Sequence, residues 1–254
     1  MTPTTHVKMS GISKSFGGVE ALSDVDFEVE AGEIVGLLGD NGAGKTTLIK
    51  ILSGALRPDA GEITVRDKPV HFRGTRDAIA AGIETIHQGA TLVDQLTVSR
   101  NLFLGREPTR RILGFLPRLD WPTMREESRT LLSQMGLHRT VDPDGVIASL
   151  SGGERQSVAI SRAMYFESDL IILDEPTNNL GLDETRRVLS FIREAKAAGR
   201  SIVFITHNVF HVFQVVDRIV VLRHGRNVGN VPAAETSVEE VERMITGVEA
   251  VAQR

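Results

Sequence analysis

The chain has 254 residues, 41% hydrophobic and 24% charged, with a formal net charge of −4, which suits one domain with subdomains. The lack of a basic excess argues against nucleic acid as the main ligand, and the lack of cysteine excludes disulfides and thiolate metal sites. No apolar run is long enough to cross a bilayer and residues 1–6 form no secretory signal, which predicts a cytoplasmic chain.

Residues 7–30 are expected to form strands. Val25, Phe27 and Val29 alternate with acidic residues, the period-2 pattern of a half-buried antiparallel strand. Phe16 stands in a Ser-Phe-Gly-Gly stretch of this region. Two interpretations of Phe16 are open, an exposed ring that stacks on a nucleotide base or a core phenylalanine.

A glycine-rich segment at 39–47, here called the glycine loop, is the strongest motif. A short apolar run precedes it and a stretch with helical apolar spacing follows it. It matches G-x-x-x-x-G-K-[ST], in which backbone N–H groups and the positive end of a helix capture phosphate. Lys45 is expected to reach the β- and γ-phosphates, Thr46 to bind Mg²⁺ and Thr47 to contact the α-phosphate. An ordinary glycine turn is the alternative, which the flanking strand and helix disfavour. The expected nucleotide-binding residues of the loop are Gly39, Asp40, Asn41, Gly42, Ala43, Gly44, Lys45, Thr46 and Thr47.

The next segment is expected to hold a strand at 62–65, a short helix at 77–81 and a strand at 83–88. The last of these ends on the polar pair His87 and Gln88.

Residues 89–150 are expected to be more helical. Thr97 can cap a helix that begins at 98, and Asp120 can open a helix that runs to about 135. Between these helices lies an apolar insertion flanked by arginines, residues 110–118. It either contacts a partner or covers the core, and we expect it to cover the core.

Residues 150–154, Leu-Ser-Gly-Gly-Glu, are here called the signature turn. Ser151 is a favourable N-cap, and Gly152 and Gly153 leave backbone N–H groups bare at the start of a helix through Met164. The chain therefore has two helix starts suited to phosphate. Because the glycine loop is expected to hold one nucleotide by itself, one solution is that the signature turn serves a nucleotide held by another copy.

Two later strands are expected to deliver polar side chains to one edge of a sheet. The apolar run 169–173 ends at Asp174 and Glu175, and the run 201–206 ends at His207. In open α/β sheets ligands bind at the carboxyl ends of the strands. Asp174 can hold Mg²⁺ through water, Glu175 can orient or deprotonate the attacking water, and His207 can donate to a γ-phosphate. A structural role is the alternative for a lone histidine.

The remaining predicted elements are a helix from about 184 to 198 that ends at Gly199, a hairpin around 223–226 and an amphipathic tail helix at 237–245.

These motifs, in this order, resemble the nucleotide-binding subunit of ABC transporters. They comprise the glycine loop, Gln88, the signature turn, residues 171–175 and His207, and the resemblance covers nearly the whole chain. It implies an α/β fold, a P-loop NTPase core with an antiparallel β subdomain and a helical subdomain that carries the signature turn.

The resemblance implies one ABC ATPase domain over residues 1–254. Its core and β subdomain would occupy about 1–88 and 165–230. The helical subdomain would occupy about 89–164, and a helical tail about 231–254.

The resemblance also implies a head-to-tail dimer that holds two ATP molecules with Mg²⁺ between its subunits. Phe16 matches the aromatic residue that stacks on adenine, and Gln88 the residue that senses Mg²⁺ or the attacking water where a membrane subunit docks. Ser151 and Gly153 would grip the γ-phosphate of the opposite subunit's ATP. The residues expected to act in catalysis are Lys45, Gln88, Glu175 and His207, those expected to hold the metal are Thr46, Gln88 and Asp174, and those expected in the signature turn are Ser151, Gly152, Gly153 and Glu154.

One departure from the family pattern follows Asp-Glu-Pro-Thr. The family commonly continues with Ser-Ala-Leu-Asp, whereas this chain has Asn178-Asn179-Leu180-Gly181. The missing aspartate leaves open how the two sites communicate. Glu175 is retained, so hydrolysis is still expected.

Shorter phrases resemble the single-cassette ATPases of monosaccharide importers of the ribose, xylose and fructose type. They include Gly39-Asp40-Asn41-Gly42, Asn101-Leu102-Phe103-Leu104-Gly105 and Thr206-His207-Asn208. The resemblance implies a peripheral homodimer at the cytoplasmic face of the membrane, which powers permease subunits that import a sugar delivered by an external binding protein. The alternatives are an ABC ATPase for another small solute and a soluble nucleotide-gated module not coupled to transport.

Overall fold

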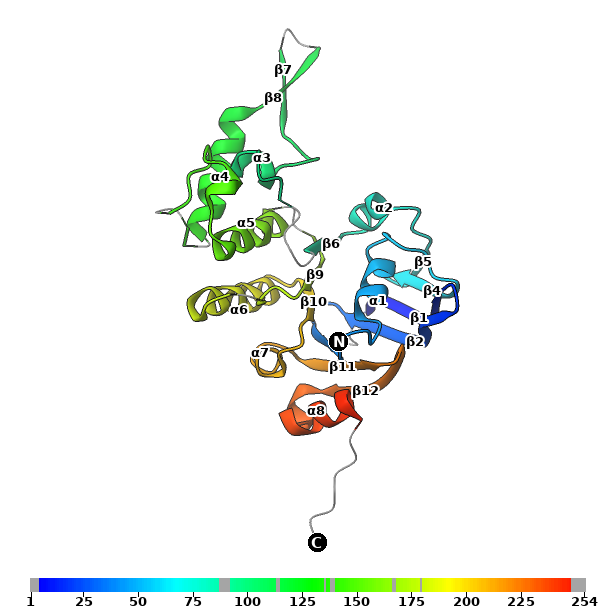
Figure 1. Ribbon diagram of the computed structural model, residues 1–254. Coiled ribbons are helices and arrows are strands. Elements are labelled where there is room, and N and C mark those ends of the chain that lie inside the picture. Colours follow the sequence, from blue (N-terminus) through cyan, green and yellow to red (C-terminus); the bar gives the residue numbers. More distant parts are fainter. Residues whose placement is uncertain are drawn as a thin grey trace. The chain divides into compact units, whose positions relative to one another are not determined.

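The computed structural model describes residues 5–86, 92–112, 115–134, 136–137, 140–165, 168–178 and 180–247. The chain divides into two compact units (Figure 1). Unit 1 comprises 1–88, 168–178 and 192–254, and unit 2 comprises 89–167 and 179–191. The helix α6 (Leu182–Ala197) begins in unit 2 and ends in unit 1.

Unit 1 contains a six-stranded sheet that positions the predicted site. Its strand order is β12-β11-β3-β10-β9-β6, and only β12 runs antiparallel to its neighbour. The strands are β3 (Ile34–Leu38), β6 (Ile83–Ile86), β9 (Leu170–Asp174), β10 (Ser201–Ile205), β11 (Arg218–Arg223) and β12 (Arg226–Pro232). All residues of β3, β9 and β10 are buried, as expected for parallel strands covered on both faces. The carboxyl ends of these three neighbouring strands therefore meet at one edge.

The second sheet of unit 1 is antiparallel, in the order β2-β1-β4-β5. Its strands are β1 (Thr5–Phe16), β2 (Val19–Glu30), β4 (Ala60–Val65) and β5 (Lys68–Val70). Val25, Phe27 and Val29 of β2 are buried and the residues between them are exposed, so the predicted alternation is confirmed. Their side chains share one core with Leu48 and Ile51.

The helices of unit 1 are α1 (Lys45–Leu52), α2 (Thr75–Ala80), α7 (Val209–Phe213) and α8 (Val238–Thr246), with a 3-10 turn at Ala233–Glu235. The predicted tail helix, α8, is capped by Ser237, whose Oγ accepts from the N–H of Glu240 at 3.2 Å. It ends at Gly247, which has a left-handed φ of 72°. Both ends therefore carry the signals that a sequence can reveal.

Unit 2 holds α3 (Val98–Leu102), α4 (Trp121–Gln134), the 3-10 turn Ile147–Ser149 and α5 (Gly152–Tyr165). The predicted caps are confirmed. Thr97 Oγ1 accepts from the N–H of Arg100 at 3.3 Å, and Asp120 Oδ1 accepts from the N–H of Thr123 at 3.4 Å. In the part of the chain that the structure describes, no helix has the length and apolar character to span a membrane.

The insertion at 110–118 differs from its prediction. It forms two antiparallel strands, β7 (Thr109–Ile112) and β8 (Leu116–Leu119), instead of a cover for the core. Phe115 and Leu116 are 72% and 49% exposed. The expectation that it covers the core was therefore wrong, because its apolar residues lie near the end of a ribbon that extends away from α3 and α4 (Figure 1).

Candidate functional site

The backbone of the glycine loop packs too closely for side chains at two positions. Gly39 has a φ of 148°, and a Cβ there would lie 2.2 Å from the carbonyl oxygen of Leu222. Gly44 has a φ of 104°, and its Cβ would lie 2.8 Å from the carbonyl oxygen of Ala21. Only glycine allows this path between β3 and α1.

The loop ends at a helix start that no side chain caps. Gly44 is the N-cap residue of α1 and makes no side-chain cap hydrogen bond. The first N–H groups of a helix need partners from outside the helix, and together with the helix dipole they favour an anion. Asp40, Asn41, Gly42 and Thr46 are exposed, so solvent reaches this end of the helix.

The side chain of Lys45 is hydrogen-bonded to the backbone of the glycine loop. Its Nζ donates to the carbonyl oxygens of Gly39 at 2.6 Å and Asp40 at 3.0 Å. Burial lowers the pKa of Lys45, while the charges of Glu175, Asp40 and Asp174 oppose that shift. The two hydrogen bonds of the ammonium are to carbonyl oxygens, which carry no formal charge. A polyphosphate supplies oxygens with negative charge, so this lysine and the bare helix start fit such a group.

The carboxylates predicted at the end of β9 are placed as expected, beside the end of β10. Asp174 is buried, 8% exposed. Glu175 donates its backbone N–H to the carbonyl oxygen of Ile205 at 2.9 Å, which ties the two strand ends together. Its φ is 50°, a left-handed conformation that costs a non-glycine residue about 1–2 kcal/mol and is concentrated at functional sites.

His207 contacts the carboxylate of Glu175. Its Nδ1 lies 3.0 Å from Oε1 and 3.1 Å from Oε2. The Glu175 side chain is only 11% exposed, whereas that of His207 is 64% exposed. Since a carboxylate only accepts, Nδ1 carries the proton of this hydrogen bond. The structure thus brings together the two residues expected at the strand ends.

The segment after His207 is held by its own hydrogen bonds. Thr206 Oγ1 accepts from the N–H of Asn208 at 3.1 Å, and Asn208 Oδ1 accepts from the N–H of His211 at 3.2 Å. His211 Nδ1 lies 3.1 Å from Thr177 Oγ1. Burial lowers the pKa of His211, and the neighbouring His207 adds to this shift. These contacts fix the backbone that presents His207.

Phe16 is exposed, as its base-stacking interpretation requires, so the core alternative was wrong. The residue is 51% exposed at the end of β1, and Lys14 Nζ lies 5.7 Å from its ring centroid. Asp59 anchors this strand end, since it accepts from Lys14 Nζ at 2.5 Å and from the N–H of Ser15 at 2.8 Å. No local pattern of the sequence indicates this anchoring role, because Lys14 and Ser15 lie 45 and 44 positions away from Asp59.

The signature turn forms a reciprocal cap at the start of α5 in unit 2. Ser151 Oγ accepts from the N–H of Glu154 at 3.3 Å, and Glu154 Oε2 accepts from the N–H of Ser151 at 2.9 Å. The predicted N-cap is confirmed. A Cβ on Gly153 would lie 2.6 Å from Glu184 Cγ, so Glu184 packs against the turn.

Arg155 was missed by the sequence reasoning. Its guanidinium donates to the carbonyl oxygens of Leu150 at 3.2 Å and Ala148 at 3.1 Å, and to Asp94 Oδ1 at 3.0 Å. These bonds hold the segment that enters the signature turn. A single arginine after a Gly-Gly-Glu stretch gave no signal of this, because its partners lie up to 61 positions away.

Gln88, expected to act in catalysis and to hold the metal, lies outside the described residues. Among the residues that the structure describes, no cluster of three or more histidine, aspartate or glutamate side chains could form a protein-only metal cage. Mg²⁺ is usually held by one or two protein oxygens together with waters and substrate phosphates. Thr46 and Asp174 are oxygen donors of the kind that fits this chemistry.

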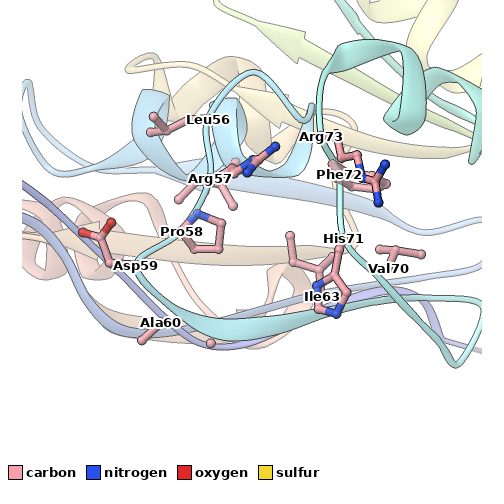
Figure 2. A pocket seen from close by; sticks show the side chains of 12 residues that line it. Leu56, Arg57, Pro58, Asp59, Ala60, Ile63, Val70, His71, Phe72 and Arg73 are labelled. Atoms are coloured by element: carbon pink, nitrogen blue, oxygen red, sulfur yellow. The ribbon is translucent and has the colours of Figure 1, made fainter.

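A separate hollow lies on unit 1, between the segment that follows α1 and the segment that follows β5 (Figure 2). Its volume is about 370 Å³, and Arg57, His71, Phe72 and Arg73 are among its lining residues. None of its lining residues belongs to the glycine loop. The hollow is therefore not part of the candidate nucleotide site.

The fold and these strand ends define a P-loop nucleotide-binding protein. The family model for ABC transporters matches residues 22–178. The chain is 42% identical to the xylose/arabinose import ATP-binding protein of Sulfolobus acidocaldarius, over 94% of this chain and 93% of that one. It is also 42% identical to the fructose import ATP-binding protein of Rhizobium meliloti, over 93% and 92%. A ribose import ATP-binding protein of Chromobacterium violaceum is 44% identical over 96% of this chain and 47% of that one.

Solved structures agree on the fold. The ATP-binding cassette MJ1267 in its ADP conformation has a TM-score of 0.79 and 24% identity, with 95% of each chain covered. The cassette MJ0796, in a dimeric post-hydrolysis state bound to ADP and Pi, has a TM-score of 0.77 and 22% identity, with 89% of this chain and 98% of that one covered. The chain belongs to the ABC transporter family, and the predicted family and P-loop NTPase fold are confirmed.

Proposed function

We propose that this ABC ATPase binds and hydrolyses ATP to power a membrane permease, and that the permease imports a sugar. The relatives that match over more than nine-tenths of both chains are named for import of xylose or arabinose and of fructose. The observation that carries the ATPase is the hydrogen bond between Glu175 and His207 on the strand ends of the sheet from which the glycine loop begins.

The residues of unit 1 divide the chemistry among them. Lys45 and the bare helix start bind the β- and γ-phosphates, and the exposed ring of Phe16 stacks on the base. Thr46, Asp174 and the expected Gln88 hold Mg²⁺, which when bound offsets phosphate charge. Phosphoryl transfer then needs mainly positioning and charge stabilisation.

Glu175 orients the attacking water and accepts its proton on a carboxylate oxygen. Because His207 Nδ1 already donates to that carboxylate, its Nε2 can donate to a phosphate oxygen only when the ring carries a second proton. In that doubly protonated form, the ring of His207 carries positive charge next to the carboxylate. It stabilises negative charge that develops on the transferred group.

In each ATP site, the glycine loop comes from one copy of the chain and the signature turn from another copy. Ser151 and Gly153 of one subunit would contact the γ-phosphate held by the glycine loop of its twin, in a homodimer with two sites. The dimer would sit peripherally at the cytoplasmic face of the membrane, against permease subunits. An external binding protein would deliver the sugar to that permease.

Two variants test the assignment in ATP-binding and phosphate-release assays, with and without the permease. Lys45→Ala should weaken ATP binding roughly 10- to 150-fold, because a charge-assisted hydrogen bond to phosphate is lost. Glu175→Gln should bind ATP as the wild type does but hydrolyse it at least about 100-fold more slowly.

Matched controls are Lys50→Ala, an exposed lysine on the same helix, and Glu62→Gln, an exposed glutamate on β4. Neither should change binding or hydrolysis more than about twofold. If Glu175→Gln released phosphate at the wild-type rate, the proposed general base would be wrong.

A further inference from the structure

The β7–β8 hairpin is strongly cationic and carries an apolar end. Residues 108–119 include three arginines and no acidic residue. Near the end of the ribbon Phe115 is 72% exposed and Leu116 is 49% exposed. Figure 1 shows the ribbon extending away from the helices of unit 2. An isolated two-stranded ribbon is only marginally stable in water, so a contact outside the core of unit 2 would stabilise this projection.

Both faces of the hairpin carry positive charge. Arg110 lies directly opposite Arg118 in the strand register, and Arg111 lies opposite Pro117. Successive pairs in an antiparallel ribbon point to opposite faces, so the first pair and the second pair occupy different faces. The charge therefore surrounds the ribbon on two sides, while the apolar residues are concentrated near its end.

None of these arginines has a carboxylate partner among the residues that the structure describes. Arg110, Arg111 and Arg118 take part in no ion pair there, whereas the exposed arginines Arg125 and Arg129 of α4 each have one. Like charges directly opposite each other destabilise a strand pair. Anions bound beside the ribbon would relieve this repulsion.

We propose that this hairpin binds anionic lipid headgroups, with Phe115 and Leu116 entering the interface of the bilayer. Arginines near a negatively charged leaflet bind its headgroups, and aromatic and leucine side chains bury in the boundary between headgroups and acyl chains. The long arginine side chains keep their guanidinium groups among the headgroups while the end inserts. The hairpin is thus a membrane contact of the subunit's own, in addition to any contact with permease.

The geometry favours a lipid surface over a protein partner. A protein binding site of fixed shape contacts mainly one face of a ribbon, whereas here the cations lie on both faces around an apolar end. A partner strand is also disfavoured, because Pro117 lacks an N–H and charged residues discourage further strand pairing. A fluid layer of anions surrounds such an end on all sides.

Vesicle flotation of the purified full chain tests the proposal. The wild type should bind vesicles that contain phosphatidylglycerol but not neutral phosphatidylcholine vesicles, and high salt should release it. Arg110→Gln combined with Arg118→Gln should weaken this binding roughly 30-fold, the effect of two surface arginines. Phe115→Ser should weaken binding as well, with the salt dependence kept.

The matched control is Arg125→Gln combined with Arg129→Gln, which removes the same charge from exposed positions of unit 2. It should bind vesicles as the wild type does. Equal affinities of the hairpin and control variants, or no binding of the wild type to anionic vesicles, would overturn the proposal. So would binding that appears only when permease is in the vesicle, because the partner would then be protein.

The proposal depends on the proposed function only in placing the subunit at a membrane, and the two fail separately. Vesicle binding is measured without nucleotide or permease, and ATP hydrolysis in solution is measured on the same samples. All hairpin variants should keep the wild-type rate of hydrolysis in solution, which also shows that they fold. A chain that binds anionic vesicles but hydrolyses no ATP contradicts the ATPase and leaves the lipid contact standing.

Discussion

At the residue scale, a buried histidine of unit 1 links stability to pH. His6 is 6% exposed, and its Nδ1 lies 2.9 Å from Ser201 Oγ. The Ser201 hydroxyl donates its one proton to the carbonyl oxygen of Glu30 at 3.0 Å, so Nδ1 of His6 is the donor to Ser201. Nε2 is buried without a hydrogen-bond partner among the described residues. A second proton on this ring would therefore create a buried charge.

This environment predicts a loss of stability in mild acid. Burial, helped by the charge of Arg66 and opposed by Asp169, lowers the pKa of His6 from 6.5. Below about pH 6.5 the unfolded chain takes up a proton that the folded chain resists, so the free energy of unfolding falls as the pH is lowered. The slope from one proton is at most about 1.4 kcal/mol per pH unit. Above pH 6.5 this contribution fades, and it is nearly gone about one pH unit higher, where the histidine is neutral in both states.

Urea unfolding at about pH 7.5 and about pH 5.5 measures the effect. His6→Gln can still donate to Ser201 but does not titrate, so the difference between the two pH values should shrink. The exposed His71 gives a control, since His71→Gln should leave that difference unchanged. If His6→Gln kept the full wild-type difference, another group would be responsible.

Residue by residue, the sequence predicted what local patterns encode and missed what long-range contacts supply. Glu175 and His207 were found because each directly follows an apolar strand. Their mutual hydrogen bond joins positions 32 apart, which no local pattern reports. The left-handed φ of Glu175 had no signal in the sequence either, because the residue is not a glycine. Asp59 and Arg155 were missed for the same reason, because their partners lie on other elements.

At the element scale, the start of α5 is stabilised by one reciprocal pair. Ser151 and Glu154 each accept a backbone N–H of the other, and the hydroxyl of Ser151 also donates to Glu154 Oε2 at 2.9 Å. The hydrogen bond from the Ser151 N–H lowers the pKa of Glu154. Such a cap satisfies donors that a helix start otherwise leaves without partners.

A double-mutant cycle on this pair should show coupling. Ser151→Ala should lower the free energy of opening the first turn of α5 by about 1 kcal/mol, the usual effect of a lost N-cap. Adding Glu154→Ala to Ser151→Ala should lower it by less than Glu154→Ala does alone, because the two share their bonds. Hydrogen exchange at the amides of Glu154 and Arg155, which donate to the hydroxyl and the carbonyl oxygen of Ser151, measures this local opening. Strictly additive effects would mean that the reciprocal cap is absent in solution.

Elements were predictable where their ends carried signals. Thr97, Asp120 and Ser237 cap helices that the sequence anticipated, and the buried β9 and β10 are continuous apolar runs. The β7–β8 hairpin lacked both kinds of signal. Its strands are four residues long, and arginines occupy positions that an alternating pattern would leave apolar.

At the scale of the whole molecule, the proposed function splits each ATP site between two chains. The glycine loop belongs to unit 1 and the signature turn to unit 2. If each chain completed its own ATP site, its glycine loop and its signature turn would have to contact the same nucleotide. In the proposed dimer, the loop of one copy works with the turn of its twin, and every site is incomplete without the partner.

Mixing two inactive variants tests this division. Lys45→Ala removes the phosphate-binding lysine, and Ser151→Asp keeps a good N-cap residue but puts negative charge where the γ-phosphate should lie. Each variant alone should hydrolyse ATP poorly. In a mixed dimer, the Ser151→Asp chain supplies an intact Lys45 and the Lys45→Ala chain an intact Ser151, which together complete one of the two sites. An equal mixture in which half of the dimers are mixed should regain about a quarter of the wild-type rate if the sites act independently.

The recovery should require both variants and should rise with protein concentration, because it depends on association. A mixture of Lys45→Ala with Glu175→Gln is the matched control. Both positions lie in unit 1, and in the proposed dimer a chain's Lys45 and its Glu175 serve the same ATP. In the mixed dimer each site then has one defective loop or carboxylate, so no site is complete and no recovery is expected. If the test mixture did not recover while both variants still bound one another, each chain would complete its own site. Recovery in the control would mean instead that Lys45 and Glu175 of one chain serve different sites.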